Sequence, residues 1–192
     1  MKPILGLRLN RLSSMTETSN CPLCNEPGGA LLYRNGFLRV IDAGEPHYPA
    51  FTRVVLNRHV QEMTDLTSAE RRALMGAVYL VEALQRRHFQ PHKINVAQLG
   101  NMVPHVHWHI IPRFRDDRHF PNPVWGAARD LSSETDSEAA QACADRVTLV
   151  KRHLPAYQQD LTDTFTTVFG DPEATLPDDA ELEQTLLRIA DL

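Results

Sequence analysis

The sequence predicts an α+β fold with an antiparallel sheet, and two observations predict it. Short runs rich in β-branched and apolar residues are separated by segments that carry glycine, proline or asparagine, and these runs are 37–41, 51–56, 92–98 and 105–111. One long helical pattern lies between the second and the third run. Strands that precede and follow a single helix are typical of an α+β domain, in which the helix packs on one face of the sheet.

The long helix has a clear start, a clear end and one apolar face. Thr67 and Glu70 have the spacing of a capping box, so we expect the helix to begin just after Thr67. It is expected to reach about Phe89, because Pro91 cannot continue it. The apolar residues recur every three or four positions and form one buried stripe: Leu74, Val78, Val81 and Leu84.

The chain is expected to divide into three parts. Residues 1–20 have no core pattern and are predicted to be a disordered leader, in which Met15 is a candidate alternative start. Residues 21–126 carry the strands and the long helix and are predicted to form the functional domain. Residues 127–192 are predicted to be a helical extension with an acidic tail.

The extension is expected to contain two helices. The first is predicted at 134–153, after an irregular segment rich in proline. The tail is acidic from Tyr157 onward, and a short final helix is predicted at 178–191.

Composition excludes several classes of partner. The net charge of −4 gives no broad attraction to nucleic acid, so an anionic substrate would need a local cluster of donors. No segment approaches the roughly 18 apolar residues of a membrane span, and we expect a cytoplasmic protein without a membrane partner. The three cysteines are an odd number, which argues against a disulfide framework. Nothing indicates an organic cofactor.

The most informative segment is the run 105–111, which carries three histidines at alternate positions. In a strand, His105, His107 and His109 would share one face, and the apolar residues between them would face the core. Such a face could bind zinc, or one imidazole could act as a nucleophile while its neighbours bind phosphate. His105 and His109 would lie about 13 Å apart, too far for one metal ion to bind all three rings, so the nucleophile is favoured.

The segment H-V-H-W-H-I-I resembles the pattern His-φ-His-φ-His-φ-φ of the histidine-triad (HIT) family, where φ is apolar. Further segments resemble the family in the same order along the chain: CPLC at 21–24, VID at 40–42, VVLNRHV at 54–60 and DLTSAE at 65–70. The resemblance covers about residues 20–126 and is nearest to bacterial diadenosine tetraphosphate hydrolase-like members. It implies a HIT-like fold: a five-stranded antiparallel sheet, one long helix and a C-terminal helical extension.

The resemblance also implies a mechanism. His107 would attack the α-phosphorus of an adenosine nucleotide conjugate, and water would release the mononucleotide from the nucleotidyl-histidine. His109 would contact the phosphate, and His105 would orient the strand or bind metal. The substrate would be a dinucleoside polyphosphate, such as diadenosine tetraphosphate, or a nucleoside phosphoramidate. Nucleotidyl transfer to another acceptor, or a nucleotide-binding scaffold with incidental turnover, are the alternatives.

Residues around the histidines are assigned less directly. The resemblance implies that Asp42 binds the ribose, although an aspartate here could equally form a turn. It places Asn95 and Gln98 near the nucleotide. Gly100 could donate backbone N–H groups to the phosphate, together with Asn101. Asn101 replaces the glutamine that the family often has before the triad, and this leaves the leaving group open.

Two arginines and a tryptophan follow the triad. Arg113 and Arg115 would share a face and could offset substrate charge, but a solvated position is favoured for both. Trp125 could reach the active site of a partner subunit, as a C-terminal segment does in dimeric members, or pack locally. The resemblance implies a homodimer that joins two sheets edge to edge, which would also protect an exposed strand.

Cys21 and Cys24 form a C-x-x-C pair, which could be a redox pair, half of a zinc site or two buried thiols. In some members of the family such a pair completes a structural zinc site with two histidines. These map to His59 and His105. A Cys₂His₂ set suits zinc and would tie the N-terminal segment to the histidine strand.

Overall fold

The computed structural model describes residues 20–130, 137–170 and 176–190, so the predicted leader, with Met15, lies almost wholly outside the described residues. The sheet has the order β1-β2-β3-β5-β4, and all its pairs are antiparallel. Its strands are β1 Ala30–Arg34, β2 Leu38–Asp42, β3 Thr52–Leu56, β4 Lys93–Gln98 and β5 His107–Arg113. The helices are α2 Pro22–Asn25, η1 Met63–Asp65, α3 Ser68–Phe89, α4 Ser137–Phe169 and α5 Asp179–Ala190. The predicted five-stranded α+β fold is confirmed.

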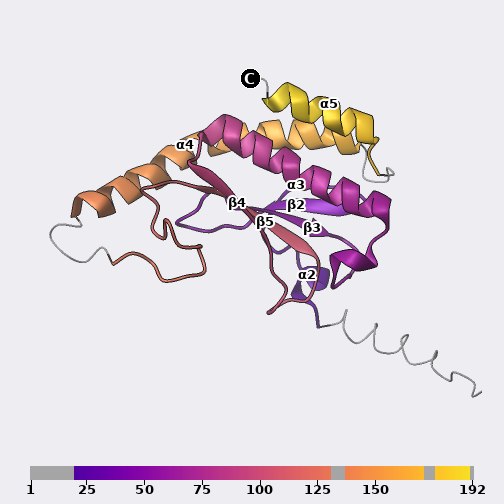
Figure 1. The fold of residues 1–192 in the computed structure, drawn as a ribbon, viewed down its shortest axis with the longest axis horizontal. Helices are drawn as coiled ribbons and strands as arrows, with labels where there is room; N and C mark the ends of the chain where they lie inside the picture. Colours follow the sequence, from indigo (N-terminus) through magenta and orange to yellow (C-terminus); the bar gives the residue numbers. More distant parts are fainter. Residues whose placement is uncertain (1–19, 131–136, 171–175, 191–192) are drawn as a thin grey trace, which may run out of the picture.

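Helix α3 begins and ends where the sequence predicts. The hydroxyl of Thr67 accepts a hydrogen bond from the Glu70 N–H at 3.2 Å, and the Glu70 carboxylate accepts one from the Thr67 N–H at 2.8 Å. This pair is the predicted capping box. The buried stripe of α3 packs against β3 and β5, so the helix covers the middle of the sheet (Figure 1).

Helix α4 is longer than predicted, because it continues through Pro155 to Phe169. The residues beyond the proline include a helical stripe of large apolar side chains that is fully buried against α3 and β1: Tyr157, Leu161, Phe165 and Val168. Burying such a stripe outweighs the roughly 3 kcal/mol that an interior proline costs a helix. The expectation that the first helix of the extension ends near residue 153 is therefore wrong.

Helix α5 lies on the outer side of α3 and α4 and agrees with the short final helix that was predicted (Figure 1). Gly76 of α3 permits this packing. A Cβ atom at Gly76 would collide with the side chain of Leu182, which α5 places directly against it. The boundary between the domain and the extension at residue 126 stays a prediction, although α4 and α5 share one apolar core with α3.

Two strands differ from the sequence expectations. Strand β1 was not predicted; it lies at one edge of the sheet and is covered by α4, where the Thr162 hydroxyl donates to the Leu32 carbonyl at 3.0 Å. Strand β5 begins at His107, so His105 precedes it, and it does not end before Pro112. Beyond Ile110 it pairs only with β4, and a proline is tolerated where a strand has one neighbour.

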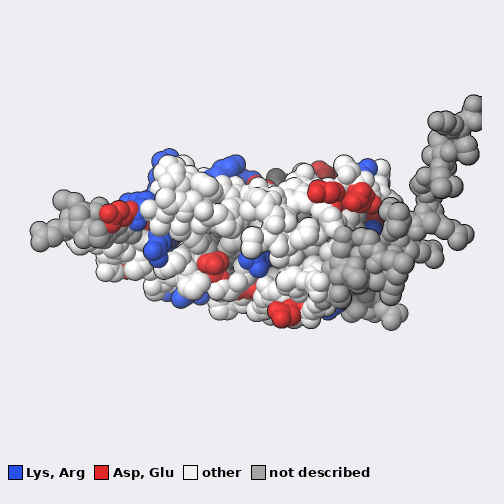
Figure 2. Space-filling view, turned by 90° about the horizontal axis from the view of Figure 1, so that it is seen from below, with Lys and Arg blue, Asp and Glu red and all other residues white. Residues whose placement is uncertain are grey.

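The two faces of the sheet have different surroundings. Apolar side chains such as Val40, Val54 and Ile110 point toward α3 and α4 and form the main core. The opposite face carries His107 and His109, and it is bordered by α2 and by the loop that follows β5 (Figure 1). The surface in Figure 2 shows basic and acidic side chains scattered among neutral ones. Among the described residues, no helix is long and apolar enough to cross a membrane.

Arg113 anchors the loop that follows β5. Its side chain is buried and makes a two-pronged ion pair with Asp117, with Nε to Oδ2 at 2.7 Å and Nη2 to Oδ1 at 3.0 Å. It also donates to the Asn122 carbonyl at 2.8 Å, so it holds the loop at two points. The expectation that Arg113 is solvated is wrong, because a buried carboxylate faces it; Arg115 is exposed, as expected.

Replacing Asp117 with asparagine is expected to lower the free energy of unfolding at pH 7 by about 3 kcal/mol, because the buried Arg113 charge loses its partner. Burial raises the pKa of Asp117, but hydrogen bonds from Arg113 and from the His119 N–H more than offset this and hold it below its ordinary value. The ion pair therefore stabilises the wild type above the unfolded pKa of about 4 and is lost as the pH falls through the lower folded pKa.

Urea unfolding at a series of pH values measures this, with Asp116→Asn as the matched control. Asp116 pairs with Arg146, but both side chains are about 30% exposed, so the control should lose about 1 kcal/mol or less. Equal losses for the two variants, or a loss for Asp117→Asn that stays constant down to the lowest pH, would show that the buried pair does not contribute as described.

Candidate active site

His107 and His109 lie side by side on the open face of the sheet. Their ring centroids are 4.8 Å apart, and both side chains are buried. Strand β3 supplies their neighbours, since Val55 pairs with His107 and Arg53 pairs with His109. The prediction that alternation in this strand separates histidines from core residues is confirmed for these two, because Val106, Trp108 and Ile110 belong to or pack on the main core.

A hydrogen bond to the backbone determines the tautomer of His107. Its Nδ1 lies 2.6 Å from the carbonyl oxygen of His105, and a carbonyl can only accept, so Nδ1 carries the proton. The other ring nitrogen, Nε2, then has a free lone pair. Burial lowers the pKa of His107, the hydrogen bond opposes this, and the nearby Arg53 lowers it further. The arrangement is a neutral imidazole oriented as a nucleophile or base.

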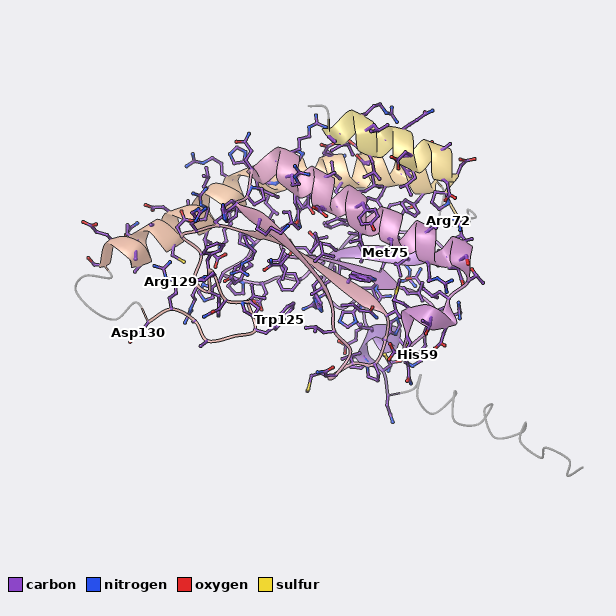
Figure 3. The ribbon with its side chains drawn as sticks, viewed as in Figure 1. His59, Arg72, Met75, Trp125, Arg129 and Asp130 are labelled. Atoms are coloured by element: carbon purple, nitrogen blue, oxygen red, sulfur yellow. The ribbon has the colours of Figure 1, made fainter. Side chains whose placement is uncertain are left out.

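His109 is held in the neutral form more strongly than His107. Burial, then His107 and Arg53, lower its pKa to about 3. Aromatic rings surround it: the centroid of Phe51 is 5.4 Å away and that of Trp125 is 5.2 Å away. Trp125 is thus a neighbour of the histidines of its own chain, and it lies in the loop on the side of the sheet away from α3 (Figure 3).

His105 belongs to a different cluster from the other two histidines. Its Nδ1 lies 3.4 Å from Cys21 Sγ and 3.6 Å from Cys24 Sγ, and Cys24 Sγ lies 3.3 Å from Nδ1 of His59. The four ligand atoms all lie within 4.8 Å of one another. The cluster joins the turn at α2 to the segment before β5, with His59 beside α2 (Figure 3).

The donor set and its spacing fit zinc. A tetrahedral zinc ion with bonds of about 2.0–2.3 Å holds its donors about 3.3–3.8 Å apart, which matches the three sulfur–nitrogen separations of 3.3, 3.4 and 3.6 Å. His105 is also in the right tautomer, because its Nε2–H donates to the Leu56 carbonyl at 2.7 Å and leaves Nδ1 free for the cluster. The metal would supply a structural cross-link. Cys21, Cys24, His59 and His105 would hold it.

Arg39 supports this cluster and was not identified from the sequence. It is buried on the same face of the sheet, and its guanidinium donates to the carbonyls of Pro27 at 3.0 Å and Leu23 at 2.7 Å. The chain around the C-x-x-C pair is therefore attached to β2 as well as to the histidines. The arginine within the otherwise apolar run at 37–41 is the signal in the sequence that could have indicated this role.

The remaining residues predicted for the site are only partly brought together. Asn95 is on the histidine face of β4 and accepts a hydrogen bond from Arg113 at 2.6 Å. Gly100 and Asn101 lie in the loop that leads from β4 to His105, and Asn101 is exposed. Gln98 pairs with Trp108, so alternation places it on the opposite face of the sheet from the histidines.

Asp42 is also directed away from the histidines. Its Oδ1 accepts a hydrogen bond from the Gly44 N–H at 2.8 Å, which is the turn-forming alternative. Its Oδ2 accepts one from Gln158 of α4 at 3.0 Å, on the helix side of the sheet. The structure therefore gives Asp42 a role in shaping the end of β2.

Comparisons with known proteins agree with this geometry. Residues 26–116 match the model of the HIT domain. A protein named AP-4-A phosphorylase from Mycobacterium tuberculosis is 26% identical over 112 residues, which cover 55% of this chain and 57% of that protein. A bis(5'-nucleosyl)-tetraphosphatase (asymmetrical) from Schizosaccharomyces pombe is 30% identical over 95 residues, 47% of this chain and 52% of that protein. The chain thus matches only a little over half the length of these relatives.

A crystal structure of a histidine triad protein from Sinorhizobium meliloti is similar as well. It is 25% identical, has a TM-score of 0.51, and the match covers 68% of this chain and 97% of that one. The fold and the paired histidines are similar to those of histidine-triad proteins. The resemblance to the HIT family is confirmed over residues 26–116, the part of the chain that matches the HIT-domain model.

Proposed function

We propose that this protein cleaves dinucleoside polyphosphates, such as diadenosine tetraphosphate, by covalent catalysis at His107. The Nε2 lone pair would attack the α-phosphorus, form a P–N bond and expel the remaining nucleotide. Water would then attack the nucleotidyl-histidine and release the mononucleotide. The observation that carries this proposal is the 2.6 Å hydrogen bond from Nδ1 to the His105 carbonyl, because it leaves Nε2 unprotonated.

The two named relatives support the substrate class, since their names refer to diadenosine or dinucleoside tetraphosphates. They differ in the acceptor. One name describes a phosphorylase, in which inorganic phosphate takes the place of water. This is the specific reason to keep nucleotidyl transfer as the second candidate. Phosphoramidates remain a further substrate class for the same His107 chemistry.

Other residues would bind the substrate around His107. His109 would offer a hydrogen bond to the phosphate, and the backbone around Gly100 and Asn101 would face the leaving group. Trp125 would border the nucleotide, because it packs against His109 and Phe51. Asp42 and Gln98 are left out of the proposed site because both project toward the helix side.

The proposed assembly is a homodimer through strand β4. This strand is at the edge of the sheet, and its outer side borders an open groove with a volume of about 540 Å³. Val96, which is 36% exposed, lies on it. An uncovered edge strand with apolar side chains favours pairing with a second copy, which would extend the sheet across both subunits.

Product analysis tests the proposed function. Incubation of diadenosine tetraphosphate in water should give AMP and ATP, whereas added inorganic phosphate should give ADP and ATP if phosphate is the acceptor. ¹⁸O-labelled water would place the label in AMP when water is the acceptor. Rapid quenching should yield a protein adduct of one AMP on His107. Failure to cleave dinucleoside polyphosphates or phosphoramidates under any of these conditions would contradict the proposal.

A further inference from the structure

We propose that Arg53 binds the phosphate group on which His107 acts and supplies the positive charge of the site. The inference rests on the proposed function and names a phosphate-binding residue that the histidine pattern does not include. The ligand is the anionic phosphate of an adenosine nucleotide. Arg53 lies on the middle of β3, outside the histidine motif.

The register of the sheet places Arg53 beside the histidines. Arg53 pairs directly with His109 across β3 and β5, and Val55 pairs with His107. Side chains of directly paired residues project from the same face, with Cβ atoms about 4.5–5.5 Å apart. The guanidinium is therefore within reach of a phosphate above the rings of His107 and His109.

The Arg53 side chain is half-buried, and only some of its hydrogen-bond donors have a partner. Its guanidinium lies over the Phe51 ring, 5.3 Å from the centroid, and Nη1 donates to the Gly28 carbonyl at 3.3 Å. Its Nε is buried without a hydrogen-bond partner. The ion pairs formed among the described residues do not include Arg53. Burial lowers the pKa of Arg53, and the charge of Glu45 opposes this without a direct contact. A buried cation with an unused donor favours an anionic ligand.

The two fully buried arginines on this face, Arg39 and Arg113, already have hydrogen-bond partners. Arg39 donates to the carbonyls of the chain around α2 and to the side chain of Asn57. Arg113 is paired with Asp117 and also donates to Asn95. If either guanidinium turned toward a ligand, its present hydrogen bonds would break, and a buried charge or a loop contact would lose its partner. Among the buried and half-buried arginines of this face, Arg53 is the one whose Nε has no hydrogen-bond partner.

The charge of Arg53 is needed because His109 cannot supply one. With a pKa of about 3, His109 is neutral at pH 7 and can donate only a neutral hydrogen bond. A phosphodiester that is being attacked carries negative charge on its non-bridging oxygens. A guanidinium binds two such oxygens with a planar pair of donors, which an imidazole cannot do.

The test compares AMP with adenosine, which differ only in the phosphate. Titration calorimetry would be carried out on the wild type, Arg53→Gln, Arg53→Lys and Arg86→Gln. The last removes the same charge from an exposed position on α3 and serves as the matched control. Arg53→Gln should bind AMP about tenfold to a hundredfold more weakly, with adenosine affinity unchanged. The AMP affinity of Arg53→Lys should lie between those of the wild type and Arg53→Gln, because lysine keeps the charge but lacks the planar pair of donors.

Two results would overturn the inference. One is AMP affinity in Arg53→Gln equal to that of the wild type. The other is an equal loss for AMP and adenosine, which would indicate a structural role at Phe51 and Gly28. If the wild type binds neither compound, the adenosine part of the proposed function fails, and pyrophosphate titrated into the same proteins then decides whether Arg53 holds a phosphate.

Discussion

Replacing His107 with alanine is expected to reduce kcat for diadenosine tetraphosphate by about 10⁴-fold or more, because it removes the only group proposed to form a bond to phosphorus. The loss in free energy of unfolding should be much smaller than the loss of transition-state stabilisation that this fall in kcat represents. The ring of His107 lies at the open face of the sheet and makes one hydrogen bond, to the His105 carbonyl. Steady-state kinetics with product analysis measures the effect.

The control is His153→Ala, which removes an exposed imidazole from α4 and should leave kcat unchanged. The adduct experiment separates the role of a nucleophile from that of a base. His107→Ala should yield no AMP-protein adduct after rapid quenching, whereas His109→Ala should still form one, more slowly. An active His107→Ala variant, or an adduct that it still forms, would exclude His107 as the nucleophile.

Removal of the metal is expected to have the largest effect on stability. The purified protein should contain about one zinc ion per chain, and Cys24→Ser should lose it. Because zinc binds the folded chain, a free zinc concentration a thousand times Kd stabilises the fold by about 4 kcal/mol. That contribution should disappear in the variant and in chelated wild type. Metal analysis together with thermal unfolding measures both.

Cys143→Ser is the matched control, since Cys143 lies on α4 outside the four-residue cluster. It should keep the zinc and the stability of the wild type. Metal loss should also reduce activity, because the His105 side chain belongs to the cluster while its carbonyl positions His107. Zinc-free protein with unchanged stability would show that the Cys₂His₂ cluster does not hold a structural metal.

The sequence alone indicated the elements with strong local signals. The capping box at Thr67 and the apolar stripe of α3 are local patterns, and the structure confirms both. The pairing of His107 and His109 followed from the period of a strand, and the HIT resemblance is confirmed by the match over residues 26–116. The four-residue metal cluster was assembled from the resemblance, and the structure brings its side chains together.

The sequence did not indicate features that depend on contacts between distant segments. Strand β1 is short and becomes a strand because β2 offers it a hydrogen-bonding edge and α4 covers it. Helix α4 passes through Pro155 because its apolar stripe is buried on α3 and β1. Arg113 appeared solvated in the sequence because its partner, Asp117, meets it only when the loop turns back.

The sequence by itself determined the local patterns of the candidate site and its scaffold: alternating histidines on a strand, a C-x-x-C pair and a capped amphipathic helix. These signals are local, since each depends on residues a few positions apart. Only the tertiary structure decided what surrounds the residues of the candidate site. It directed Asp42 toward α4 and set Arg53 opposite His109. The physical reason is that strand register and burial, which join segments far apart in the chain, determine which side chains share a face and which charges lack a partner.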